Sequence, residues 1–146
     1  MDHSPTFAIS AAGMALERTR VEVAALNLAN AHTTQAAGQA AYNPMRVVAQ
    51  AASPDAFAAM MLSSDSVTST MKPDFHVEAS GAAPRMVHEP GHPMADARGF
   101  VSYPGVDAAA EMMALMSATR AYEANVAAMN AARTMALKAL DIGGQS

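Results

Sequence analysis

The chain has 146 residues, no cysteine, no tryptophan and a formal net charge of −4. Roughly a quarter of it is alanine, and its thirteen methionines outnumber its four phenylalanines and three tyrosines together, so one domain's length holds little material for an independent core and a compact enzyme is disfavoured. The weak negative charge excludes the basic surface of a nucleic-acid-binding protein, and the lack of cysteine excludes disulfides and cysteine-based zinc sites.

The N-terminal segment does not have the pattern of a secretory signal. Its most apolar stretch, residues 7–16, follows Asp2 and His3 instead of a basic region and continues directly into Glu17 and Arg18. No apolar run reaches the roughly 18 residues that a membrane span needs. We therefore expect a soluble protein without a conventional export signal.

The first predicted element is an amphipathic helix over residues 4–30. Ser4 followed by Pro5 suits an N-cap and the first helical position, where the missing N–H of proline costs nothing. Asn27 and Asn30 mark its end, because asparagine prefers caps and turns to helix interiors. The helix carries two rows with a spacing of seven, namely Ile9, Leu16 and Val23, and then Ala12, Thr19 and Leu26. These rows predict a coiled-coil-like seam.

Between about residues 33 and 103 the pattern changes to short apolar runs separated by prolines and turn-prone residues. Four of these runs predict strands: residues 45–48, 75–77, 85–87 and 100–103. The composition of residues 51–53 and 63–70 indicates loops, and residues 56–62 are compatible with a helical turn. We expect a small β-containing or extended insert.

A second helix is predicted from about residue 107 to residue 140. Pro104 and Gly105 form a turn before it, Asp107 suits its N-cap, and Glu111 places negative charge near its positive end. Its row at three- and four-residue spacing is Met112, Leu115, Thr119, Tyr122, Val126, Met129, Ala136 and Leu140. At 1.5 Å per residue the helix is about 50 Å long. No globule that this chain can supply is large enough to bury that length.

The segment His88-Glu89-Pro90-Gly91-His92 matches the H-E-x-x-H pattern of zinc metalloproteases. The pattern binds zinc because a helix places both histidines on one face, with the glutamate as general base. Pro90 and Gly91 are incompatible with that helix. A turn that contains two histidines is the favoured interpretation.

The methionines also raise the possibility of a soft-metal carrier, since thioethers favour Cu(I). Met112, Met129 and Met135 lie at helical spacing, without dense Met-x-x-Met clusters, and methionine is an adaptable packing residue. We therefore favour packing and expect no cofactor and no metal.

Three polar residues interrupt the apolar row of the second helix: Arg120, Glu123 and Asn125. In one interpretation they form a solvated helix face. In the other they fix the register against another chain, as buried polar residues do in coiled coils. The residues alone leave both interpretations open.

Three segments resemble the bacterial flagellar basal-body rod protein family. LNLANAHT, residues 26–33, is similar to the N-terminal signature of flagellar rod and hook proteins, and SATRAYEANVAAMNAARTMALKALDIG, residues 117–143, is similar to their C-terminal signature. HEPGHPMADARGFVSYPGV, residues 88–106, is similar to the segment that marks proximal rod members. The short length also fits a proximal rod member, because hook and distal-rod proteins carry larger inserts. Residues 36–84 carry no specific resemblance.

The resemblance implies a mainly α fold with long N- and C-terminal helices packed as an antiparallel coiled-coil-like pair. Residues 4–33 plus 105–142 would form an axial helical domain, and residues 34–104 an outward-facing insert of strands and loops. It also implies a non-enzymatic structural subunit, exported by the flagellum's own type III apparatus without a cleavable signal. Such a subunit links the membrane-ring and export base to the distal rod and transmits torque.

The implied partners are copies of the chain, other rod subunits, proteins at the junction of ring and export gate, and the distal rod, but no nucleic acid or small-molecule substrate. The residues expected to hold helices and subunits together are Ile9, Leu16, Val23, Leu26, Asn27, Asn30, Met112, Leu115, Arg120, Tyr122, Asn125, Val126, Met129 and Leu140. One alternative function is a free-standing helical adaptor or export chaperone. A weaker one is a zinc hydrolase that uses His88 and His92, with Glu89 as base.

Overall fold

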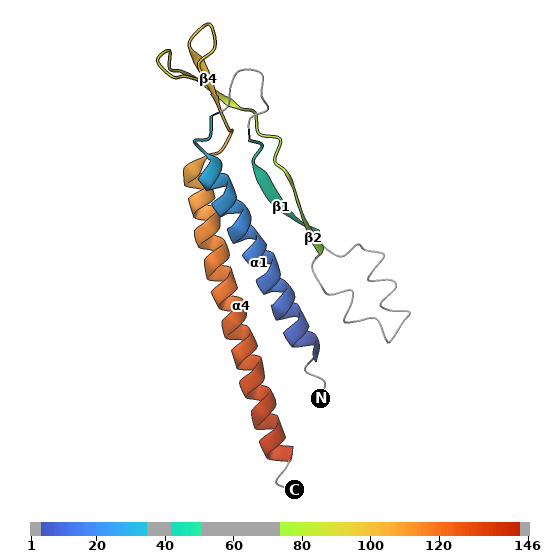
Figure 1. Cartoon of the computed structure of the whole chain (residues 1–146). Helices are drawn as coiled ribbons and strands as arrows, with labels where there is room; N and C mark the ends of the chain where they lie inside the picture. Colours follow the sequence, from blue (N-terminus) through green and yellow to red (C-terminus); the bar gives the residue numbers. More distant parts are fainter. Residues whose placement is uncertain (1–3, 35–41, 51–73, 144–146) are drawn as a thin grey trace, which may run out of the picture. The chain divides into compact units, whose positions relative to one another are not determined.

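The computed structural model describes residues 4–34, 42–50 and 74–143, and it contains two long helices with short strands between them (Figure 1). The elements in chain order are α1 (Ser4–Asn30), β1 (Met45–Gln50), β2 (Asp74–Ala79), β3 (Arg85–His88), β4 (Phe100–Tyr103) and α4 (Ala108–Gly143). The predicted mainly helical architecture with a strand-containing insert is therefore confirmed. The predicted loops at residues 51–53 and 63–70 and the helical turn at residues 56–62 lie outside the described residues.

The chain divides into two compact units, and both helices run through both of them. The first unit consists of Met1–Thr19, Ala49–His76 and Ala118–Ser146, and the second of Arg20–Val48 and Val77–Ser117. The division into residues 4–33 plus 105–142 and residues 34–104 stays a prediction, as does the coiled-coil geometry of the helices.

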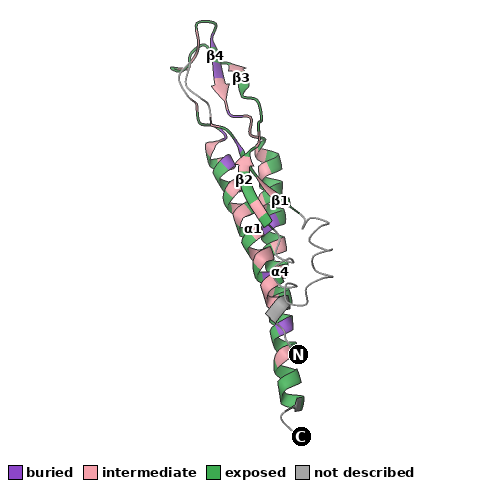
Figure 2. Ribbon diagram, turned by 90° about the vertical axis from the view of Figure 1, so that its right-hand side faces the viewer, coloured by how far each residue is buried: buried purple, intermediate pink, exposed green. Residues whose placement is uncertain are grey.

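In the first unit the buried side chains of the two helices are small or polar. α1 buries Ser10 and Glu17, and α4 buries Ala118 and Ala132 (Figure 2). Gly13 of α1 lies so close to α4 that an added Cβ would come within 3.0 Å of the Asn125 side chain. Helices approach this closely only where their facing side chains are small.

In the second unit β3 and β4 form an antiparallel hairpin in which Arg85 pairs with Tyr103 and His88 with Phe100. Val101 is completely buried. The chain then enters α4 through Asp107, whose Oδ1 accepts hydrogen bonds from the backbone N–H groups of Ala109 and Ala110 at 2.9 and 3.3 Å. The predicted N-cap is therefore confirmed, and it satisfies two of the N–H groups that a helix start leaves without partners.

Gly105, in the turn before α4, packs directly against the backbone of Ala83. A Cβ at this position would overlap the carbonyl oxygen of Ala83 and come within 3.1 Å of the Ala82 Cβ. We expect Gly105→Ala to destabilise the hairpin and the start of α4 by about 1–3 kcal/mol, because the backbone on both sides must move. Hydrogen exchange of the β3 and β4 amides measures this effect. Gly91→Ala is the matched control, since its Cβ would point into open space, and its effect should stay within about 0.5 kcal/mol.

Candidate assembly surfaces and a buried polar junction

The predicted rows of α1 place their large side chains at the surface more than in the interior. Ile9 and Leu26 are exposed, and Leu16, Val23 and Asn30 are half-buried. Three buried positions of α1 come one residue after a member of the first row, at Ser10, Glu17 and Ala24, and the fourth is Asn27. Glu17 is only 8% exposed and has an interaction partner. The buried seam of α1 is therefore small or polar.

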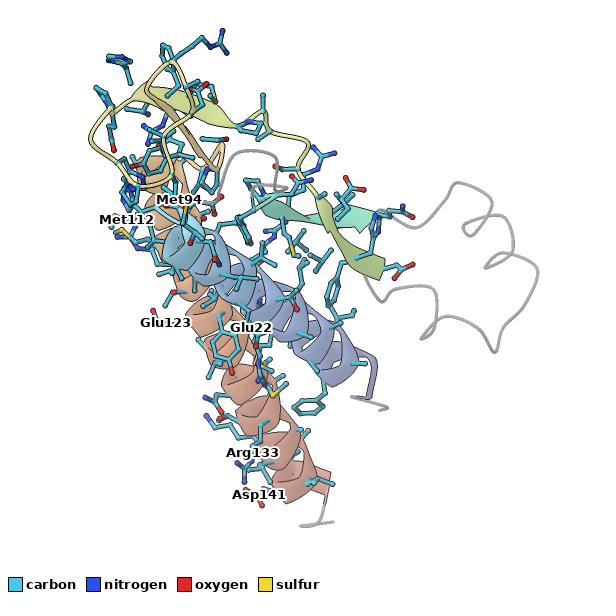
Figure 3. All side chains as sticks on the ribbon, turned by 45° about the horizontal axis from the view of Figure 1, so that its top comes forward. Glu22, Met94, Met112, Glu123, Arg133 and Asp141 are labelled. Atoms are coloured by element: carbon cyan, nitrogen blue, oxygen red, sulfur yellow. The ribbon has the colours of Figure 1, made fainter. Side chains whose placement is uncertain are left out.

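The same division holds on α4. Figure 3 shows Met112 on the outer edge of the helix, and Arg120, Tyr122 and Leu140 are also exposed. Leu115, Asn125, Val126 and Met129 are half-buried. Five further large apolar side chains are exposed on this helix, namely Met113, Met116, Met135, Leu137 and Ile142. The large apolar side chains of α4 are therefore mostly at the surface.

A polar junction in the second unit is centred on Asn27, which is 0% exposed. Its Oδ1 accepts hydrogen bonds from the Met45 N–H and the Tyr42 hydroxyl, both at 2.9 Å. Its Nδ2 donates to the Met45 carbonyl oxygen at 2.8 Å and to Glu111 Oε1 at 2.9 Å. The amide thus uses both donors and both acceptor positions. Burial, and to a smaller extent the nearby Glu111 carboxylate, raises the pKa of Tyr42.

The sequence interpretation of Asn27 as a helix-end residue is incomplete. The helix ends three residues later, at Asn30, whose Nδ2 donates to the Leu26 carbonyl oxygen at 2.8 Å. Asn27 instead connects α1, the chain before β1 and the first turn of α4. Tyr42 was missed by sequence reasoning, and Glu111 was recognised only as a charge near a helix end. The available signal was the position of Asn27 in the row of the buried Ala24 and Ala31, because an amide there needs hydrogen-bond partners.

The segment His88-Glu89-Pro90-Gly91-His92 forms the predicted turn at the end of β3. The His88 ring packs edge-on against Phe100, Glu89 accepts a hydrogen bond from the Tyr103 hydroxyl, and His92 Nδ1 accepts one from the Met94 N–H. The carboxylate of Glu89 raises the pKa of Tyr103. Among the described residues no group of three histidine or acidic side chains is placed to hold a metal ion. The polar atoms of this segment organise the hairpin loop.

Asp96 closes the same loop through hydrogen bonds to backbone N–H groups. Its Oδ1 accepts hydrogen bonds from the backbone N–H groups of Phe100 and Arg98, both at 2.8 Å, and the Phe100 bond is the main reason that the pKa of Asp96 lies below its ordinary value of 3.8. A carboxyl whose pKa is lower in the folded state stabilises that state above the unfolded value. We expect the loop to stay ordered down to about pH 3.8 and to loosen as the pH falls through the lower folded value.

The chemical shift of the Phe100 amide, followed against pH, measures this transition. Asp96→Asn is the control, because its side-chain oxygen still accepts hydrogen bonds but does not titrate, so the transition should disappear. A midpoint at or above the ordinary aspartate value would contradict the assignment.

No helix of the described residues combines the length and the apolar character that a membrane crossing requires. Residues 97–142, which contain β4 and most of α4, match the family model described as the flagellar basal body rod FlgEFG protein C-terminal region. The chain is 36% identical over 137 residues to the flagellar basal-body rod protein FlgC of Salmonella typhimurium, an alignment that covers 94% of this chain and 95% of the relative. It is 37% identical to FlgC of Escherichia coli O157:H7, with 94% and 95% covered, and 35% identical to FlgC of Bacillus subtilis, with 92% and 94% covered.

These similarities define a structural component of the flagellar basal-body rod and not an enzyme. The chain belongs to the FlgC family of flagellar basal-body rod proteins. The resemblance of the chain to flagellar basal-body rod proteins is thereby confirmed.

Proposed function

We propose that the chain is a subunit of the proximal rod that polymerises through its terminal helices. It joins copies of itself and other rod subunits between the membrane-ring and export base and the distal rod, and it transmits torque along this connection. Residues 34–104 face outward from the axis, and export proceeds through the flagellar type III apparatus without a cleaved signal. The observation that supports this proposal best is the distribution of side chains on α4, which buries alanines and exposes methionine, leucine and isoleucine.

The last turns of α4 offer the clearest surface for another subunit. In the first unit Gly13 is level with Asn125, and α1 begins nine residues before Gly13, at Ser4. At equal rise per residue, the start of α1 therefore lies level with about residue 134 of α4. Beyond this level α4 continues to Gly143 (Figure 1) and exposes Leu140 by 70% and Ile142 by 79%. No turn of α1 among the described residues covers them, so a neighbouring subunit is the proposed cover.

Two contacts support an antiparallel, coiled-coil-like pairing of the helices. Gly13 lies against Asn125 in the first unit, and Asn27 donates a hydrogen bond to Glu111 in the second. The two positions on each helix are separated by two heptads. This is the spacing at which a coiled coil returns the same face to its partner. The small residues of the seam favour a close approach but supply little buried area, so we propose that assembly completes the pairing.

Cysteine trapping in cells tests the proposal, and the absence of natural cysteines gives it a clean background. A gene with Gly13→Cys and Asn125→Cys replaces the chromosomal copy, and basal bodies are purified after mild oxidation. We expect the chain to copurify with the basal body and to contain an intrachain disulfide, detected by its faster migration without reductant. Each single cysteine variant is a control that cannot form this bond. A discrete soluble oligomer with stable helices, absent from basal bodies, would instead indicate an adaptor or export chaperone.

A further inference from the structure

We propose that Asn27 couples the order of the insert to the pairing of α1 with α4. The Asn27 amide binds the strand segment that begins at Met45. All of its hydrogen bonds can form together only when the end of α1 and the start of α4 are side by side. Asn27 is thus a positioning residue that passes a change in helix pairing on to β1 and β2. The trigger, helix pairing during assembly, rests on the proposed function, whereas the coupling is a property of the chain itself.

The Asn27 side-chain amide makes the two hydrogen bonds to the Met45 backbone that a neighbouring strand would make. The Met45 N–H donates to Asn27 Oδ1 at 2.9 Å, and Asn27 Nδ2 donates to the Met45 carbonyl oxygen at 2.8 Å. The amide therefore binds the first residue of β1 as a neighbouring strand would, and it fixes both the position and the direction of the segment. The Tyr42 hydroxyl adds a third bond to the same side chain at 2.9 Å.

Because of Glu111, the binding of the strand segment by Asn27 also depends on α4. It accepts the remaining N–H of Asn27 at 2.9 Å, which also orients the amide, because the opposite orientation would direct the Asn27 oxygen at a carboxylate. Without the first turn of α4, a completely buried N–H would lose its partner, and buried polar groups without partners are strongly disfavoured. The three segments therefore stabilise one another.

The strand segment that Asn27 binds in turn contacts β2 and the residue after it. The Ser80 N–H donates to the Pro44 carbonyl oxygen at 2.7 Å, and Arg46 forms an ion pair with Glu78 at 2.7 Å. Neither contact touches Asn27. Protection of the Ser80 amide against hydrogen exchange thus reports whether the order established at Asn27 reaches β2.

The experiment measures hydrogen exchange in the full chain with Gly13→Cys and Asn125→Cys, whose disulfide holds the helices together and removes pairing as a variable. In the oxidised chain with Asn27 present, we expect a protected Ser80 amide. Asn27→Ala should accelerate Ser80 exchange about tenfold or more, the effect of losing the equivalent of one or two hydrogen bonds, while the amides in the middle of α4 change by less than twofold. Equal rates with and without Asn27, or an equal acceleration in the helices, would overturn the coupling, as would an unprotected Ser80 in the oxidised parent.

A reversal of the hydrogen-bond polarity tests the role of Glu111. N27D places a carboxylate oxygen opposite Glu111 and should accelerate Ser80 exchange at least as much as Asn27→Ala. E111Q alone keeps an acceptor and should change the rate by less than twofold. N27D/E111Q restores one bond, now donated by the new amide. Its Ser80 amide should therefore exchange at least threefold more slowly than that of N27D. A double variant as fast as N27D would exclude the link to α4.

Discussion

Replacing Leu140 by aspartate should abolish incorporation of the chain into basal bodies and swimming, while export of the chain continues. The Leu140 side chain is 70% exposed on the last turns of α4, where no described turn of α1 lies beside it. The substitution therefore removes nothing from the interior of the isolated chain. In the proposed rod the same side chain is buried against a neighbouring subunit, and burying a leucine contributes about 1.5–3 kcal/mol. A carboxylate in its place must also lose its water, and every subunit repeats this cost.

The measurements are motility in soft agar, the amount of chain in purified basal bodies, and the amount exported. Lys138→Asp is the control. It places the same charge at the same helix end, so its unfavourable interaction with the helix dipole is at least as large, but it replaces a side chain that is already charged. We expect this variant to assemble and swim. Normal swimming of Leu140→Asp, or equal loss in both variants, would show that the end of α4 is not an apolar subunit contact.

The boundaries of the elements could be predicted because they depend on local chemistry. Asp107 caps α4 through its own side chain, the two helices have the predicted extents within a few residues, and each predicted strand was found. The turn at Pro90 and Gly91 follows from the same local rules, since proline and glycine end regular structure wherever they occur. These features do not require knowledge of what lies beside them.

The buried face of each helix could not be determined from the pattern in the same way. A subunit that packs both within its own chain and against others carries apolar residues on more than one face, and alanine occurs on all sides of both helices. The search for rows of large residues selected Ile9 and Leu26, which are exposed, whereas the seam contains Ser10, Gly13 and Ala24. Large apolar residues indicate that a helix face is buried in some contact. Only the structure shows which faces are buried within the chain.

The polar junction at Asn27 could not be predicted from the sequence for a different reason. Its partners Tyr42 and Glu111 are 15 and 84 residues away along the chain, and no spacing rule connects residues of an insert to a helix that follows it. Asparagine near a helix end also has a sufficient local explanation, which Asn30 fulfils. The complete use of the Asn27 amide is visible only when all three segments are in place.

Because the seam between the helices consists of small residues, we expect a second large effect from Ala118→Leu. Ala118 is 2% exposed in the first unit, and on the same helix the Asn125 side chain would lie within 3.0 Å of a carbon added at Gly13 of α1. Leucine adds three carbons, so the helices must separate or adopt strained side-chain conformations, at a cost of about 1–3 kcal/mol. We expect the close approach of α1 and α4 to become roughly 5–150 times rarer, the range that corresponds to this cost.

The rate of disulfide formation in the chain with Gly13→Cys and Asn125→Cys measures this approach directly, and it does so whether the isolated helices are fully or only partly ordered. Ala127→Leu is the matched control, because Ala127 lies on the same helix but is exposed. It makes the same chemical change without entering the seam, and the rate should stay within twofold of the parent. If Ala118→Leu also left the rate unchanged, the helices would not depend on a seam of small residues. If the control slowed trapping as much, the effect would arise from the helix itself and not from its packing against α1.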